Sequence, residues 1–226
     1  MRTLIVVAAL LFSGCANKLK HHVGDIDSIS VHAREGDVNP SVDLGDLPAP
    51  DDREDTEGVR VNRTVGHVAI EVFEASFAIR LLQLVDNRQM ARRVAEGFRE
   101  SFPQGRPFPV QPGSDWDMEV RVADWGVGAD FNNVAEAELQ LDVSLFSPEG
   151  ERVWRRQISC GQDLAPNLYW DARQIAANLG VISSMTDRQI QGVYRSLTVS
   201  CAEKLEERWR VDVRRAREKA RKMQDD

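Results

Sequence analysis

Residues 135 to 145 constrain the fold of this chain more than any other stretch, because apolar and polar side chains alternate there without a fault. The apolar set is Ala135, Ala137, Leu139, Leu141, Val143 and Leu145, and the polar set is Glu136, Glu138, Gln140, Asp142 and Ser144. Successive side chains of a strand point to opposite faces, so this period of two predicts a long strand with one buried and one solvated face. Such strands are typical of antiparallel sheets covered on one side.

Two shorter segments complete a sheet around this strand. Residues 118–122 alternate in the same way, and residues 152–160 form a returning strand rich in β-branched and aromatic side chains. The sequence SPEG at 147–150 is a strong turn, since proline fixes φ and glycine adopts conformations that other residues avoid. Residues 126–128, with sequence GVG, are expected to begin the loop before the long strand. The pattern predicts a three-stranded antiparallel meander.

Apolar residues from Thr64 to Phe102 recur at spacings of three and four, which is the helical period. They are Val65, Val68, Val72, Ala75, Ile79 and Leu82, followed by Met90, Val94, Phe98 and Phe102. We expect a break at Asp86-Asn87, where either side chain can cap a second helix. A strand over 68–72 remains an alternative, because that segment is rich in β-branched residues.

Helices are also predicted at the C-terminal end. Asp171 with Gln174, and Thr186 with Gln189, have the spacing of capping boxes. After the second box one apolar stripe runs through Ile190, Val193, Leu197, Cys201, Leu205 and Trp209 and continues more weakly to Met223. The predicted fold class is therefore α+β. It has an antiparallel meander of three to four strands, helices packed on one face and a long C-terminal helix.

The stretch 34–60 differs from the rest of the chain. It holds nine acidic and three basic residues, three prolines, three glycines and no aromatic residue. Such a composition buries too little apolar surface to offset the entropy of ordering, so a flexible acidic tether is expected. Residues 26–31 form a possible short strand before it. This divides the chain into a signal segment 1–14, a tethering segment 15–60 and a folded domain 61–226.

The N-terminus carries a short apolar run, Leu4 to Phe12, after the basic Arg2. The run is too short to span a bilayer and has the length of a signal-peptide core. The sequence LFSGC at 11–15 resembles the lipobox of bacterial lipoproteins. That resemblance implies removal of residues 1–14, a covalent lipid on Cys15, and, with Ala16 following, sorting to the periplasmic face of the outer membrane. A plain secretory signal or an uncleaved apolar N-terminus remains the alternative.

Export changes the interpretation of the other two cysteines. With Cys15 acylated, Cys160 and Cys201 form an even pair in an oxidising compartment, where disulfides persist. Cys201 lies on the apolar stripe that faces the predicted sheet, whose third strand ends at Cys160. We expect a disulfide between them, with two unconnected buried thiols as the alternative.

Catalytic patterns are scarce. All four histidines lie in the first third of the chain, so none is expected in the predicted sheet, and the sequence has no G-x-S-x-G, P-loop or dinucleotide-binding motif. We predict no enzyme activity, no cofactor other than the lipid, and no metal site, His21-His22 being read as a solvated pair. Asp115, Asp117 and Asp124 leave a carboxylate hydrolase as a weaker alternative.

Two tryptophans, Trp116 and Trp125, lie beside these aspartates. They would suit either a sugar-stacking surface or ordinary packing at the edge of the sheet.

The last helix is strongly basic between Arg208 and Lys222, with eight basic and two acidic residues. The basic residues are Arg208, Arg210, Arg214, Arg215, Arg217, Lys219, Arg221 and Lys222. They predict a surface for an anionic partner such as lipid head groups, a glycan or the acidic stretch of the same chain. A solvated helical face is the alternative. The formal charge of −7 argues against nucleic acid.

These features together resemble a group of small envelope lipoproteins. The lipobox, the tether, DWDMEVRVADWGV at 115–127, LFSPEGERVW at 145–154 and the closing helices are similar to the auxiliary lipoproteins of ABC-type lipid transport systems. They are also similar to the lipopolysaccharide-assembly lipoprotein and to lipoprotein activators of penicillin-binding proteins. The resemblance implies a non-catalytic, lipid-anchored accessory or scaffold of a cell-envelope complex. A lipid- or glycan-binding lipoprotein is the alternative.

Overall fold

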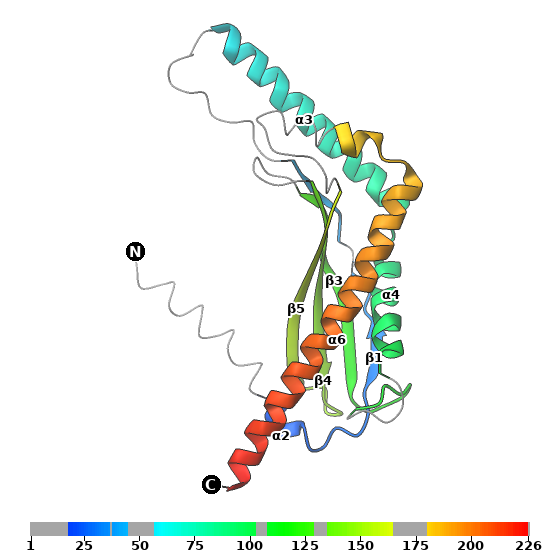
Figure 1. The fold of residues 1–226 in the computed structure, drawn as a ribbon, viewed down its shortest axis with the longest axis vertical. Helices are drawn as coiled ribbons and strands as arrows, with labels where there is room; N and C mark the ends of the chain where they lie inside the picture. Colours follow the sequence, from blue (N-terminus) through cyan, green and yellow to red (C-terminus); the bar gives the residue numbers. More distant parts are fainter. Residues whose placement is uncertain are drawn as a thin grey trace, which may run out of the picture.

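The meander predicted around residues 135–145 is the centre of the fold (Figure 1). A computed structural model describes residues 18–36, 38–44, 57–102, 108–128, 135–164 and 180–225, without the side chains of 57–67 and 225. Its elements are α2 (Leu19–His22), β1 (Ser30–Ala33), β2 (Ser41–Asp43), α3 (Glu57–Leu84), α4 (Asn87–Glu100), β3 (Asp117–Gly128), β4 (Glu136–Phe146), β5 (Arg152–Asp163) and α6 (Asp187–Asp225). The predicted α+β class is confirmed.

β4 is the middle strand of the meander and pairs antiparallel with β3 and with β5. Its alternating apolar side chains are all buried, while the opposite face carries an exposed ion network of Arg121, Asp142 and Arg155. The β4–β5 turn is the predicted one. Gly150 has φ of 78°, which favours glycine, and its N–H donates to the Ser147 carbonyl at 2.8 Å.

β3 is longer than the sequence indicated, and the loop expected at 126–128 is wrong. Gly126 pairs with Glu138 of β4 on one side and with Ser41 of β2 on the other. A Cβ at Gly126 would lie 1.8 Å from the Ser41 carbonyl oxygen, so the glycine allows β2 to approach β3 rather than ending the strand.

Two short strands, β1 and β2, lie end to end along the outer edge of β3 and pair with it in parallel. Asn87 donates to the Gly36 carbonyl at 2.7 Å and Trp125 Nε1 to the Val38 carbonyl at 2.8 Å, which holds the connection between them. The expected strand over 26–31 is shifted to Ser30–Ala33. The flexible tether expected over 34–60 is wrong for residues 38–44, because β2 finds hydrogen-bond partners on the edge of β3.

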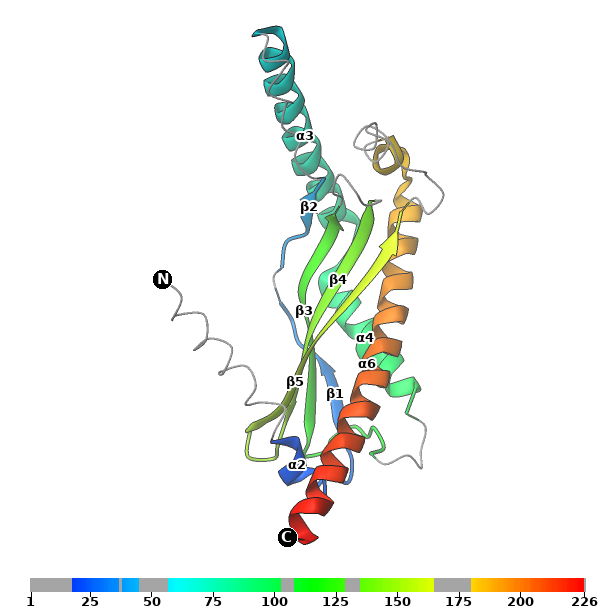
Figure 2. The ribbon, with the colours of Figure 1, turned by 60° about the vertical axis from the view of Figure 1, so that its left-hand side comes forward.

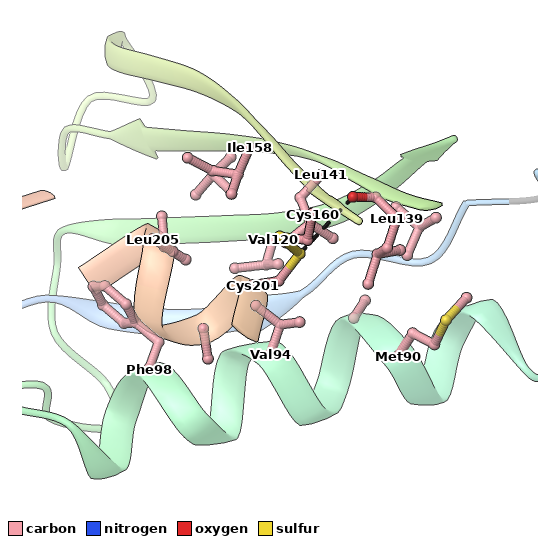
Figure 3. Packing of buried hydrophobic residues seen from close by; sticks show 14 of the residues in the cluster. Met90, Val94, Phe98, Val120, Leu139, Leu141, Ile158, Cys160, Cys201 and Leu205 are labelled. Atoms are coloured by element: carbon pink, nitrogen blue, oxygen red, sulfur yellow. Dashed lines mark hydrogen bonds between the residues drawn. A yellow bond between two sulfur atoms is a disulfide. The ribbon is translucent and has the colours of Figure 1, made fainter. Parts of the chain in front are cut away.

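Helices α4 and α6 cover the apolar face of the sheet (Figures 1 and 2). Figure 3 shows Val94 and Phe98 of α4 pointing toward α6 and the sheet, in the cluster that also contains Leu205 and Leu141. α4 begins after Asp86, whose side chain accepts from the N–H of Arg88 at 2.9 Å, so the predicted break is confirmed.

The capping box of α6 is also confirmed. The Gln189 side chain accepts from the N–H of Thr186 at 2.8 Å, and Thr186 Oγ1 accepts from the N–H of Gln189 at 3.3 Å. A short helical turn over 180–184 precedes it. The other predicted box, Asp171 with Gln174, lies outside the described residues, as do the signal segment and Cys15.

Helix α3 projects past the end of the sheet that carries β2 (Figures 1 and 2). The strand alternative for 68–72 is wrong, because the whole segment is helical. The part of α3 near the sheet is held by Glu74, which accepts from the N–H of Leu44 at 2.8 Å, and by Arg80, which pairs with Asp187 of α6 at 2.6 Å. The opposite end of the molecule carries α2 and the C-terminal end of α6. No helix within the described ranges is long and apolar enough to cross a membrane.

Candidate functional site

The structure brings the two predicted cysteines together. Cys160 on β5 and Cys201 on α6 have Cα atoms 5.7 Å apart and sulfurs 2.06 Å apart, which is a disulfide (Figure 3). Both side chains are buried in the core. The bond links α6 to β5, the edge strand of the meander.

One histidine lies in the sheet, so the expectation that the sheet has none is wrong. His32 is on β1, which joins the sheet through its parallel pairing with β3. Its Nε2 lies 2.6 Å from Ser30 Oγ and 3.4 Å from Asp117 Oδ1. A Ser-His-Asp relay needs the serine and the carboxylate on different ring nitrogens, and here both contacts are to Nε2. Ser30 is also buried, so its hydroxyl has no open path to a substrate.

Asp117 has an unusual environment. Its Oδ1 is buried and has no hydrogen-bond partner among the described residues. Burial raises the pKa of Asp117, the nearby His32 opposes that shift, and the charge of Glu119 adds to it. A buried carboxylate oxygen left without a donor is a cost to the fold.

The three aspartates considered for catalysis are not assembled into one site. Asp117 and Asp124 are separated by about 23 Å along β3 at the usual rise per strand residue. Asp115 precedes the strand and lies farther still from Asp124. A glycosidase pair needs carboxyl groups about 5 to 9.5 Å apart, so neither Asp115 nor Asp117 forms one with Asp124.

The two neighbouring tryptophans act in packing. Trp116 and Trp125 are 7% and 1% exposed. Trp125 lies edge-on to Tyr194 of α6, with ring centroids 5.4 Å apart, and Tyr194 donates a hydrogen bond to the Gly126 carbonyl at 2.6 Å. Burial raises the pKa of the Tyr194 hydroxyl. Neither tryptophan offers a face for stacking a sugar.

The eight predicted basic residues divide between two faces of α6. At 100° per residue, spacings of four, three and four place one set on a single stripe, which we call the arginine face. It consists of Arg210, Arg214, Arg217 and Arg221. The second set, turned away from it by roughly a third of a turn, consists of Arg208, Arg215, Lys219 and Lys222.

The arginine face borders a cavity of about 340 Å³ with an apolar floor. The floor consists of Phe102, Phe108, Trp209 and Val213. Arg217 lies over the Phe108 ring at 4.8 Å and Arg210 over the Phe102 ring at 5.8 Å. No sequence pattern indicated this cavity, because Phe102 and Phe108 come from a different part of the chain than α6.

A second unusual surface lies on α3. Val68, Val72, Ile79 and Leu82 are 53%, 60%, 58% and 51% exposed. With the exposed Ala75 they form one stripe along the helix, which we call the α3 stripe. The opposite face buries Ile70, Phe77 and Leu81. α3 is therefore apolar on two opposite sides, and only one is covered by the described residues.

Metal binding has no support in the described ranges, where no group of three histidine, cysteine, aspartate or glutamate side chains could hold an ion. Within the described residues, the protein has two layers, a sheet and its covering helices. The projecting part of α3, which we call the arm, lies at one end, and the basic part of α6 lies at the other.

Comparison with known proteins adds little to this description. No family model matches the sequence, and no curated protein matches it. Among solved structures, protein XCC0632 from Xanthomonas campestris, of the family DUF330, matches at 13% identity with a TM-score of 0.28. The match covers 53% of this chain and 65% of that one, so the chain spans less than two thirds of that structure. At this TM-score the match carries no argument about fold or function.

Proposed function

We propose that this chain is a lipid-anchored accessory or scaffold protein of a cell-envelope complex, facing the periplasm. The observation that carries the proposal is the α3 stripe, an exposed apolar surface on a projecting helix. Apolar side chains scattered singly over a surface are normal, whereas contiguous apolar patches mark sites of interaction with other proteins. An amphipathic helix offering residues at helical spacing is a common mode of docking into a partner's groove.

The position of the proposed anchor agrees with this role. Cys15 precedes Lys18 by three residues, a span of at most about 11 Å. Lys18 forms an ion pair with Glu151 in the β4–β5 turn, and Leu19 is buried, so α2 is tied to the body at that end. α3 projects from the opposite end (Figure 2). An acyl group on Cys15 would leave the body between the membrane and the arm, with the arm free to reach a partner.

The basic end of α6 lies at the same end as α2 (Figures 1 and 2). Lysine and arginine near a membrane surface are attracted to anionic head groups by about 1 kcal/mol each. The basic helix would therefore reinforce a lipid anchor at this end.

The docking role is tested with two matched pairs of substitutions. Val72→Asp with Ile79→Asp places two charges on the α3 stripe, whereas Ala69→Asp with Ser76→Asp places them on exposed positions farther round the same helix. All four positions are exposed, so both variants should fold. We expect the first pair to abolish co-purification of the chain with a membrane complex and the second to retain it. Equal behaviour of the two pairs would exclude the stripe as the docking surface.

The anchor has its own test. Metabolic labelling with a fatty acid should mark the wild-type chain and not Cys15→Ala. A Cys15→Ala chain that is labelled equally well would remove the lipid anchor from the proposal.

A further inference from the structure

The cavity beside the arginine face combines two kinds of surface that differ sharply in chemistry. One side is apolar and aromatic, formed by Phe102, Phe108, Trp209 and Val213. The other carries the guanidinium groups of the arginine face, with the single carboxylate of Glu218 among them. A ligand that satisfies both sides needs an apolar segment and an anionic group.

Not all of the positive charge that borders the cavity is paired with carboxylates of the protein. Arg210 is paired with Glu206, one turn earlier on α6. Arg214 and Arg221 are exposed and form no ion pair with another residue in the described part of the chain. Guanidinium groups spaced along one helical face can contact phosphate oxygens through paired N–H groups, a geometry that lysine does not offer.

We propose that this cavity binds an anionic phosphate-bearing lipid, one acyl segment lying on the aromatic floor and the phosphate lying against Arg214 and Arg221. The apolar floor favours a lipid over a free soluble anion, since an anion alone would leave the floor exposed to water. The volume of about 340 Å³ is at the lower end of the range for small-molecule sites. It suits part of one acyl chain rather than a whole two-chain lipid.

This inference is independent of the accessory role proposed above. Lipid binding requires neither an acyl group on Cys15 nor the α3 stripe, and it is measured in a chain that carries no acyl group. The two proposals can therefore fail separately.

The experiment titrates the full chain carrying Cys15→Ser with lysophosphatidylglycerol below its critical micelle concentration, followed by calorimetry. We expect saturable binding of one lipid per chain. Lysophosphatidylcholine, which has the same acyl chain and a zwitterionic head group, should bind at least about tenfold more weakly. Glycerol 3-phosphate, which lacks the chain, should bind about 100-fold more weakly, the loss expected from exposing only a few methylene groups.

Two charge-matched variants distinguish a defined site from a diffuse basic surface. Arg214→Gln with Arg221→Gln removes two positive charges from the arginine face, and Arg208→Gln with Lys219→Gln removes two from the other face. The first variant should bind lysophosphatidylglycerol at least about tenfold more weakly and the second within about twofold of wild type. Thermal melts of both should match wild type, since all four side chains are exposed.

Three outcomes would overturn the proposal. Equal losses in the two variants would indicate only a basic helix surface. Equal affinity for the zwitterionic lipid would remove the role of the arginines. Equal affinity for glycerol 3-phosphate would show an anion site without an acyl component.

Discussion

The indole Nε1 of Trp154 on β5 donates a hydrogen bond to Asp212 Oδ2 on α6 at 3.0 Å, in the core between the helix and the sheet. Arg156 of the same strand adds hydrogen bonds to both carboxylate oxygens, at 2.6 and 3.2 Å. Burial alone would raise the pKa of Asp212, but these donors and the charge of Arg156 outweigh burial and hold the pKa below its ordinary value. The carboxylate thus ties the basic half of α6 to β5.

Loss of this carboxylate should be costly. Asp212→Ala leaves the buried Trp154 N–H without an acceptor and the Arg156 charge without its partner, so we expect a loss of about 2–4 kcal/mol in the free energy of unfolding. Asp187→Ala, which removes an exposed carboxylate from the same helix, should cost less than about 1 kcal/mol. Urea denaturation measures both. Similar losses for the two would mean that the Trp154–Asp212 bond contributes little.

The same group gives the fold an acid-sensitive component. The pKa of Asp212 and that of Asp142 are both lowered in the folded state, so folding is favoured while these groups are charged. That stabilisation is complete well above the unfolded value of 3.8 and is lost as the pH falls through the lower folded values. We expect stability to decrease below about pH 5 and Asp212→Ala to flatten that decrease. An unchanged pH slope in the variant would contradict this assignment.

The ionisation of Asp117 should affect the pH dependence of stability in the opposite direction. Its folded pKa is raised, so the charged form is disfavoured in the fold, and the penalty is present above the folded pKa and absent below the unfolded one. Asp117→Asn is expected to stabilise the protein at pH 7 by up to about 1 kcal/mol, a small value because solvent screens the charge of this side chain. The substitution should have no effect near pH 3. Paired melts at the two pH values measure it. A well-folded variant that lost its function in cells would instead revive a chemical role for Asp117.

Close packing of α4 on α6 depends on Gly97. A Cβ at this position would lie 2.9 Å from Ala202 Cβ, a contact that side chains do not make. Gly97→Ala should therefore destabilise the protein by about 1–3 kcal/mol, although alanine favours helix by about 1 kcal/mol. Adding Ala202→Gly moves the methyl group to the other helix and should recover part of the loss. A double variant whose loss is the sum of the two single losses would show that the helices do not meet here.

Some elements were predictable from the sequence because their pattern was local. The alternation in β4 and the spacing of Thr186 to Gln189 each act within one element, and both predictions are confirmed. β1 and β2 were not predictable in this way. They are four and three residues long, and what makes them strands is the distant edge of β3.

Apolar periodicity correctly predicted helix α3 but not which side of it is buried. Val68, Val72 and Ile79 carried the helical period that predicted it, yet these are the side chains that face away from the core. Phe77 and Leu81, on the opposite side, make the contacts with the body. Periodicity reports that a helix has an apolar stripe and not which neighbour covers it. The sequence predicted the eight basic residues of α6 as one surface, but the aromatic floor beside four of them needed Phe102 and Phe108 from outside α6.

The Cys160–Cys201 bond gives the last prediction. It closes a loop with a sequence separation of 41 residues, and the chain-entropy model assigns about 4 kcal/mol to a loop of this length. Replacing both cysteines by alanine should lower the free energy of unfolding by an amount of this order and loosen the middle of α6 from β5. The wild-type chain purified without reductant should migrate faster in non-reducing than in reducing electrophoresis, and its denatured form should resist thiol alkylation. Two freely alkylated thiols would show that the cysteines are adjacent but unbonded, and the double replacement would then cost only its loss of packing.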